Sequence, residues 1–339
     1  MIHNKITKLT IALPGLFWSE TTDIEDLYAK LKLTNFTKIF KHTKMSILEG
    51  SYSELVYGLH TKHSNDYAKQ IATELNLTSN YSGFLIAEPI NLQLDRDHLQ
   101  ILESNSFQLD QQHCNTIIEH INSHFVNEIK LHYISNSLWL LCHNLDINLN
   151  THQFYPTIDI RGENINDYLP RGKNIIWLNK LINEIQMLLY NMPLNQQRIN
   201  DGLLPINSLW LWNKRMQLSS DYAAIYTNSL TTGFNHAKIK PIPIIINTNL
   251  LDNSLIIIDD LYSPCCDRDG FSWIEKLQEL DNTLGLPLTQ MLYNNEIEQL
   301  DILIPQRENI IQLSTRPSYK YKFWQNKKLI NLVKEAHAY

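Results

Sequence analysis

The chain has 339 residues and a mass of 39.7 kDa, with 43% hydrophobic residues, so it can form one large domain or two of ordinary size. Its formal net charge of −6 excludes the overall basic balance that is typical of nucleic-acid-binding proteins. Nowhere do about eighteen apolar residues follow one another, so no bilayer-spanning segment and no membrane partner are expected.

Targeting and redox signals favour a cytoplasmic protein. The apolar stretch at residues 9–13 is too short for a signal peptide and is broken by Pro14-Gly15. The four cysteines include the adjacent pair Cys265-Cys266 but no C-x-x-C spacing. We therefore predict a reduced, cytoplasmic chain without disulfides.

The first 143 residues predict strands and helices in alternation. Their apolar spacing indicates a strand at residues 6–13, helices at 23–32, 51–59, 66–77 and 110–127, two short strands at 84–87 and 91–97, and a hairpin of 130–134 with 137–142. Residues 144–166 are polar and punctuated, and they predict a connecting excursion between an N-terminal part, 1–143, and a C-terminal part, 167–339. A single domain is the alternative.

The stretch from 167 to 212 is the centre of the sequence. Apolar residues recur every three or four positions over 175–192 and predict an amphipathic helix that Pro193 ends. We expect a polar loop over 194–202 and a buried strand over 206–212, in which Trp210 and Trp212 share one face.

Beyond the centre, further strands and helices are predicted. We expect strands at 222–226, 243–246 and 254–261, a helix at 273–284, and a late hairpin of 299–304 with 310–313. The continuous run Ile256-Ile257-Ile258 indicates a strand covered on both faces, as in parallel sheets. The expected class is α/β, with a mostly parallel sheet flanked by helices.

Acidic and histidine residues provide weak candidates for a metal site. Asp259 and Asp260 follow a predicted strand, where α/β sheets place ligands, but Asp also caps helices. Asp95 and Asp97 flank Arg96, which favours a turn closed by local ion pairs. His113, His120 and His124 share one helix side, yet without H-E-x-x-H or a completing carboxylate a solvated face is favoured.

The segment from Asn195 to Trp212 is the best binding candidate. Arg198 and Arg171 offer guanidinium groups for a phosphate or carboxylate, Asn195 and Asn207 offer donors and acceptors, and Trp210 with Trp212 offers an aromatic wall. The alternative is a structural loop whose Asn side chains satisfy the backbone. G-x-G-x-x-G, Walker A and G-x-S-x-G motifs are absent from the sequence.

The run NQQRINDGLLPINSLWLW (195–212) resembles the N-x-x-R-x-x-x-G-x-x-P-x-N-x-x-W-x-W signature of archaeal-type cofactor-independent phosphoglycerate mutases, members of the alkaline-phosphatase-like superfamily. Segments scattered over most of the chain resemble a bacterial group of RpfE-type regulatory, mutase-like proteins: LPGLFW, EPINLQLDRDHL, LPRG, INEIQMLL, IIIDDL and WIEKLQELD. The resemblance implies a reduced phosphomutase-like fold.

The mutases are expected to hold two metal ions and a Ser or Thr nucleophile after an N-terminal Asp-Gly. Here Pro14-Gly15 ends the first predicted strand, and the last third contains only two histidines, His236 and His337. Asn213-Lys214-Arg215 replaces the glycines that follow the second Trp in the family. Two metals need about six to eight protein ligands, which we cannot assemble.

The sequence leaves three hypotheses open. The first is a cytoplasmic regulatory or binding protein that has lost metal catalysis and takes a phosphorylated small molecule at Asn195, Arg198, Asn207, Trp210, Trp212 and Arg171, without a cofactor. The second is an active mutase or phosphatase that uses Mn or Zn at Asp259, Asp260 and Asp95. The third is a structural protein with a protein partner.

Overall fold

The computed structural model describes residues 5–18, 24–58, 65–95, 98–103, 107–145, 154–171, 175–216, 222–227, 239–240, 252–317 and 328–337. The chain divides into two compact units, and each unit is described by itself. The first unit comprises Met1–Leu55, Ser220–Ser229 and His236–Tyr339, and the second comprises Val56–Ser219 and Leu230–Asn235. Helix α3 (Tyr52–Tyr57) spans the point where the chain leaves the first unit for the second.

The first unit is built on a seven-stranded sheet. Its strand order is β11 (Ile239–Lys240), β10 (Ala224–Thr227), β12 (Ser254–Ile257), β1 (Ile6–Ala12), β13 (Ile297–Pro305), β14 (Asn309–Thr315) and β2 (Lys44–Glu49). The strands from β11 to β13 pair in parallel, and β14 pairs antiparallel with β13 on one side and with β2 on the other. The predicted α/β class with a mostly parallel sheet is confirmed.

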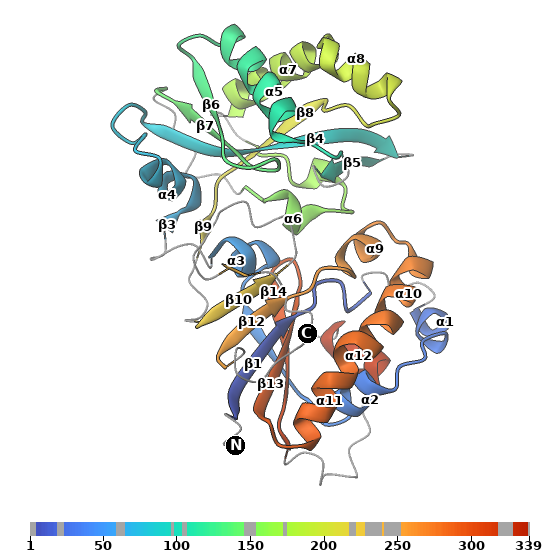
Figure 1. Ribbon diagram of the computed structural model, residues 1–339. Coiled ribbons are helices and arrows are strands. Elements are labelled where there is room, and N and C mark those ends of the chain that lie inside the picture. The colour runs from blue at the N-terminus through green and yellow to red at the C-terminus, as the bar shows by residue number, and fades with distance from the viewer. Residues whose placement is uncertain are drawn as a thin grey trace. The chain divides into compact units, whose positions relative to one another are not determined.

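Helices cover this sheet along one face (Figure 1). They are α1 (Ile24–Ala29), α2 (Asn35–Phe40), α9 (Tyr262–Cys266), α10 (Gly270–Leu280), α11 (Leu286–Tyr293) and α12 (Leu329–His337), with a π-helical turn at Asp281–Gly285. In α10 the apolar side chains of Trp273, Leu277 and Leu280 recur at helical spacing and are buried. They join Ile11 and Ile256 of the strands in one hydrophobic core, which holds the helices on the sheet.

The second unit contains an antiparallel sheet, of which the sequence predicted only the hairpin of 130–134 with 137–142. The long strand β4 (Gly83–Asp95) pairs with β7 (Trp139–His143) and then β5 (His98–Glu103), and also with β8 (Ser208–Trp212); β6 (Ile129–Tyr133) pairs with β7. Pro89 lies in β4 where one edge changes partner from β7 to β5. A proline is tolerated where a ladder is interrupted, so the two predicted short strands are one strand.

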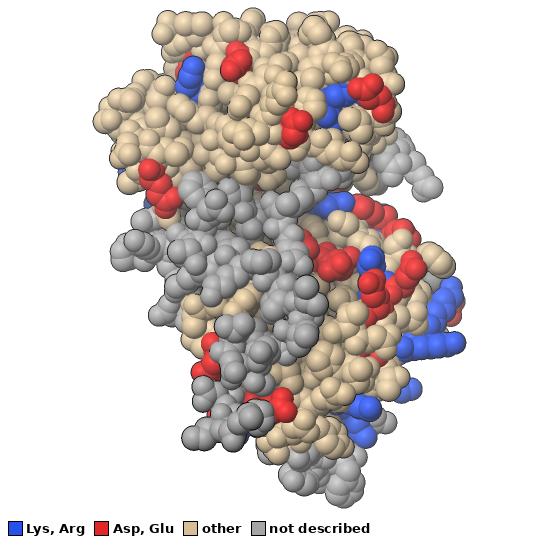
Figure 2. Space-filling model, viewed as in Figure 1, with Lys and Arg blue, Asp and Glu red and all other residues tan. Residues whose placement is uncertain are grey.

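Helices α5 (Gln111–His124), α7 (Ile175–Tyr190) and α8 (Pro193–Asn200) lie together on one side of the antiparallel sheet (Figure 1). Shorter elements complete this unit: β3 (Asn65–Asp66), α4 (Tyr67–Glu74), α6 (Thr157–Ile160), a 3-10 turn at Ile165–Asp167 and β9 (Arg215–Met216). Figure 2 shows that uncharged side chains cover most of the drawn face of this unit, with charges of both signs scattered among them.

The boundary expected at residues 144–166 falls inside the second unit. The chain of that unit continues from β7 through α6 to β8, and β8 returns to pair with β4. The polar composition of this segment suggested a boundary between two parts. The pairing of β4, before the segment, with β8, after it, instead keeps both in one unit. The expected strand at 243–246 lies outside the described residues.

Two further properties concern the described part of the chain. None of its helices is both long and apolar enough to cross a bilayer. Its four cysteines, Cys114, Cys142, Cys265 and Cys266, form no disulfide with one another.

Candidate ligand-binding site

Helix α8 replaces the polar loop that the sequence predicted after Pro193. Pro193 occupies the first turn of α8, where the missing N–H has no intrahelical partner to lose and the fixed φ suits a helix. The chain therefore ends α7 at Tyr190 and starts a second helix after two residues. Asn195 and Arg198, three positions apart, point to the same side of α8, and both are 2% exposed.

Asn195 joins α7, α8 and the segment before β8. Its Nδ2 donates to the carbonyl oxygens of Leu189 and Ile206, each at 2.7 Å, and its Oδ1 accepts from the Ile206 N–H at 2.9 Å. Since these buried backbone groups have lost water, the amide satisfies groups that would otherwise destabilise the fold. In this structure Asn195 stabilises the motif rather than facing a cavity.

Arg198 also binds backbone oxygens. Its Nε donates to the Leu204 carbonyl at 3.0 Å and its Nη2 donates to the Phe107 carbonyl, whereas its buried Nη1 has no hydrogen-bond partner among the described residues. Burial lowers the pKa of this guanidinium from its ordinary value. A guanidinium stays protonated in proteins, so one buried donor of a cation remains for another acceptor.

Asn207 holds the start of β8 against β4. Its Oδ1 accepts from the Leu92 N–H at 2.7 Å and its Nδ2 donates to the Leu92 carbonyl at 2.9 Å, as a paired strand residue would. From β4, the Asn91 Nδ2 donates to the Pro205 carbonyl at 2.7 Å. The amide side chains of the motif thus act as backbone braces, as the structural alternative expected.

The two tryptophans of β8 are buried and anchored at their indole N–H groups. Trp210 donates to the Tyr155 carbonyl at 2.7 Å, and Trp212 donates to a carboxylate oxygen of Glu88. The other Glu88 oxygen accepts from the Thr157 hydroxyl. Trp212 also stacks on Tyr67, with ring centroids 5.8 Å apart and planes at 3°. Both tryptophans are core residues here.

Sequence reasoning missed the buried charges near these tryptophans. Glu88 is 7% exposed, and Asp159 is 9% exposed and pairs with Lys214 at 3.4 Å. Buried carboxylates are costly unless hydrogen-bonded or paired, so their partners are structurally required. The only sequence signal was an acid beside Pro89 within an apolar strand, which alternation alone could not place.

Arg171 lies apart from the buried motif residues. It is exposed, and its Nη2 donates at 3.1 Å to the carbonyl of Asn166, which lies in the 3-10 turn. The structure thus brings together Asn195, Arg198 and the backbone before β8, and it leaves Arg171 at the surface of the same unit.

The acids at the carboxyl edge of the parallel sheet lie in the first unit. Asp259 and Asp260 follow β12, and Gly15 follows the adjacent strand β1. Gly15 has φ +78°, and a Cβ there would lie 2.4 Å from the Leu261 carbonyl oxygen, so the two connections approach too closely for a side chain. Asp260 is exposed. This edge is where open α/β sheets place ligands.

The remaining metal candidates belong to different units. Asp95 ends β4 in the second unit, whereas Asp259 and Asp260 belong to the first. No group of three or more His, Cys, Asp or Glu side chains is placed to hold a metal ion within the part of the chain that the structure describes. His113 contacts the helix-capping Asp110 at 3.0 Å, and His120 and His124 are exposed, which agrees with a solvated helix face.

A cysteine nucleophile is not indicated near Arg198. Cys114 is fully buried, and its Sγ donates to the Asn136 carbonyl at 3.6 Å. Burial raises the pKa of this thiol to about 12, so the thiol is protonated at neutral pH.

Comparisons with known proteins find local sequence similarity to one group of enzymes. No family model matches the chain. The 2,3-bisphosphoglycerate-independent phosphoglycerate mutase of Methanosarcina mazei is 41% identical over 59 residues, and the probable enzyme of that name from Geobacter sulfurreducens is 40% identical over 57 residues. These matches cover 17% of this chain and only 15% and 14% of the two relatives. The expected resemblance to such mutases is confirmed for one segment.

Two solved structures resemble the chain at low similarity. A protein from Pyrococcus horikoshii has a TM-score of 0.49 and 13% identity, covering 92% of this chain and 88% of its own. A cofactor-independent phosphoglycerate mutase from Thermoplasma acidophilum has a TM-score of 0.39 and 12% identity, covering 92% of this chain and 90% of its own.

Proposed function

We propose that this protein is a phosphoglycerate-mutase-like binding protein that takes a phosphorylated small metabolite and acts as a cytoplasmic regulator. The observation that carries the proposal is the 41% identity over 59 residues to the phosphoglycerate mutase of Methanosarcina mazei. A regulatory role of RpfE type is the part of the proposal that rests on the sequence resemblance alone.

In this proposal Arg198 supplies the charge for the ligand. Its Nη1 is a buried donor without a hydrogen-bond partner among the described residues, and a phosphate oxygen is a suitable acceptor. Asn195, Asn207, Trp210 and Trp212 position Arg198 by fixing α8 and β8, and the exposed Arg171 is the second cation. Entry to Arg198 requires a local opening, since the side chain is 2% exposed.

Titration calorimetry with phosphoglycerate tests this proposal. We expect saturable binding by the wild type and binding weakened about tenfold or more by Arg198→Met, which keeps an unbranched side chain but removes the charge. Leu204 and Phe107 would lose their donor in this variant, so its fold must first be verified by circular dichroism. Lys180→Met, at an exposed residue of α7, is the matched control and should bind as the wild type does.

The same samples distinguish the two alternatives. Interconversion of phosphoglycerate isomers after addition of Mn or Zn would replace the binding proposal by the enzyme, with Asp259, Asp260 and Asp95 as the first residues to substitute. Absence of phosphoglycerate binding, with Arg198→Met affecting only stability, would leave a structural protein with a protein partner.

A further inference from the structure

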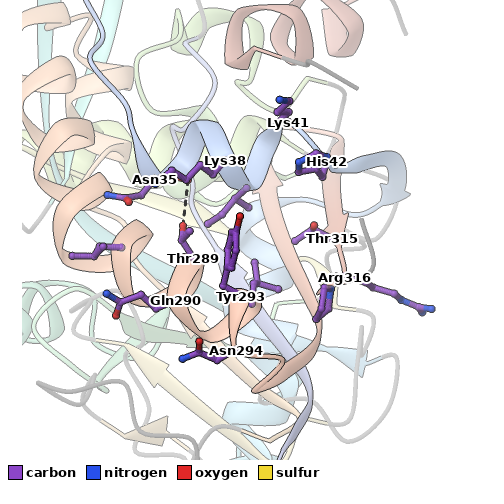
Figure 3. Close-up of a pocket in the computed structure, with 14 residues that line it drawn as sticks. Asn35, Lys38, Lys41, His42, Thr289, Gln290, Tyr293, Asn294, Thr315 and Arg316 are labelled. Atoms are coloured by element: carbon purple, nitrogen blue, oxygen red, sulfur yellow. Dashed lines mark hydrogen bonds between the residues drawn. The ribbon is translucent and has the colours of Figure 1, made fainter. Parts of the chain in front are cut away.

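The first unit contains a cavity that the resemblance to the mutases does not explain. It has a volume of about 630 Å³ and lies between α2, α11 and the end of β14 (Figure 3). Thr315 in its wall pairs with Leu300 near the start of β13, so the cavity lies toward the amino ends of the parallel strands. Asp259 and Gly15 follow the carboxyl ends of those strands, so the two places are distinct.

The lining carries positive charge only. Lys38 and Lys41 of the α2 segment and Arg316 after β14 line the cavity together with His42, and no Asp or Glu is among the lining residues. In the whole chain acidic residues outnumber basic ones, 35 to 29. A cavity lined by the two lysines and by no acid is therefore opposite in sign to the chain, and such a cavity concentrates anions.

Arg316 lines the cavity, but its guanidinium is hydrogen-bonded to Gln299. Its Nη2 donates to the Gln299 Oε1 at 2.6 Å, and the Gln299 Nε2 donates to the two carboxylate oxygens of Asp301 at 3.0 and 3.1 Å. Asp301 is 1% exposed and pairs with Lys8 at 3.1 Å. Gln299 thus holds the guanidinium on the face of the sheet opposite to Leu300 and the helices, so Lys38 and Lys41 provide the charge of the cavity.

Hydrogen bonds hold the two helices that form the cavity walls, α2 and α11, in place. The Asp281 carboxylate accepts the N–H groups of Thr34, Asn35 and Phe36, the last at 2.6 Å, and so caps α2. On α11, the Thr289 hydroxyl lies 2.8 Å from the carbonyl oxygen of Gly285 and 3.3 Å from the carbonyl oxygen of Asn35, and it can donate to either (Figure 3). The cavity walls are therefore preorganised, which reduces the entropic cost of binding.

The cavity also contains apolar and neutral polar groups. Tyr293 stands in the middle of the view between α2 and α11, and Ile39 and Leu292 line the wall (Figure 3). His42 has a buried Nδ1 without a hydrogen-bond partner among the described residues. Small-molecule sites commonly have such a mixture and volumes of about 300–1,000 Å³.

We propose that this cavity binds an organic anion with an aromatic or apolar part, a nucleoside monophosphate being a compound of this class. The anionic group interacts with Lys38 and Lys41, and the apolar part packs on Tyr293. This site is independent of Arg198 and of phosphoglycerate, so either proposal can fail without the other.

Titration calorimetry with adenosine monophosphate and with naphthyl phosphate tests the site, with adenosine and naphthol as neutral counterparts. We expect saturable binding of the anions and binding of the neutral compounds that is weaker by about tenfold or more. The double variant Lys38→Glu/Lys41→Glu should weaken anion binding by about tenfold or more. Tyr293→Ala should weaken both aromatic anions but leave the response to inorganic phosphate unchanged.

Lys30→Glu is the matched control, since Lys30 is an exposed lysine of the same unit outside the lining. It should bind the anions as the wild type does. Absence of saturable binding of either anion, equal affinity for anions and neutral counterparts, or unchanged anion affinity in a folded Lys38→Glu/Lys41→Glu variant would each overturn the proposal. Arg198→Met should leave this binding unaffected, which separates it from phosphoglycerate binding.

Discussion

At the scale of single residues, polar side chains that suggest a ligand site also serve the backbone. Asn195 and Asn207 satisfy buried carbonyl and N–H groups of the segments that flank β8, and Arg198 uses two of its nitrogens in the same way. An amide or guanidinium group offers the same donors to a phosphate and to a peptide carbonyl, so residue type could not distinguish these roles. The Nη1 of Arg198, which has no hydrogen-bond partner among the described residues, is the donor that remains for a ligand.

His143 in β7 gives a prediction about pH. It is 3% exposed, its ring centroid lies 5.5 Å from that of Trp177, and burial lowers its pKa below the ordinary value. The unfolded chain, with a His pKa of about 6.5, therefore takes up a proton that the folded chain does not. The free energy of unfolding should fall as the pH drops below about 6.5.

Replacement of His143 isolates this contribution. From pH 8 to pH 5.5 we expect the wild type to lose up to about 1.4 kcal/mol more free energy of unfolding than His143→Gln, measured by urea denaturation. His120→Gln, at an exposed position of α5, is the control variant. A constant difference between wild type and His143→Gln over this range would contradict the assignment.

At the scale of elements, one proline begins the helix α8 and another lies inside the strand β4. Pro193 starts α8 and Pro89 lies within a long strand at a change of partner, although the sequence suggested a helix end and a gap between strands. In both cases the missing N–H falls where no regular hydrogen bond is needed. Local sequence signals mark such positions but do not specify the element that comes after the proline.

The position of Pro193 in α8 predicts how two substitutions differ. Pro193→Ala should change the free energy of unfolding by less than about 1 kcal/mol, because the proline lies in the first turn of α8. Gln197→Pro, at an exposed position inside α8, should cost about 3 kcal/mol or more because it removes an interior hydrogen bond. Urea denaturation measures both. Similar costs for the two variants would mean that residues 193–200 do not form a helix in solution.

At the scale of the whole molecule, the two units differ in how many separate stretches of the chain supply their strands. All strands of the second unit lie within one continuous stretch of the chain, from Asn65 to Met216, and they pair among themselves within the described residues. The first unit is assembled from three separate stretches, which β1, β10, β12 and β13 bring into one sheet. A unit whose strands all come from one stretch of the chain can be expected to fold alone.

We therefore predict that a fragment of residues 56–219 folds by itself. It should unfold cooperatively in urea and retain a near-ultraviolet circular dichroism signal, since Trp139 and Trp212 are fully buried within this unit. A fragment of residues 1–143, cut at the boundary expected from composition, is the comparison. It lacks β8, a partner of β4, and should fail to unfold cooperatively. A non-cooperative 56–219 fragment would argue against two units.

The sequence by itself determined the class and most of the elements. Apolar periodicity placed strands β1 and β12 and helices α5, α7 and α10, because burial of one face leaves a local pattern in the chain.

Only the tertiary structure decided which segments form each unit and what the motif residues contact. Pairing of β8 with β4 joins residues more than one hundred positions apart, and the partners of Asn195, Arg198 and Glu88 come from separate segments. The cationic cavity likewise combines α2, α11 and the end of β14. Long-range contacts of this kind depend on packing between distant segments, which leaves no periodic signal in the local sequence.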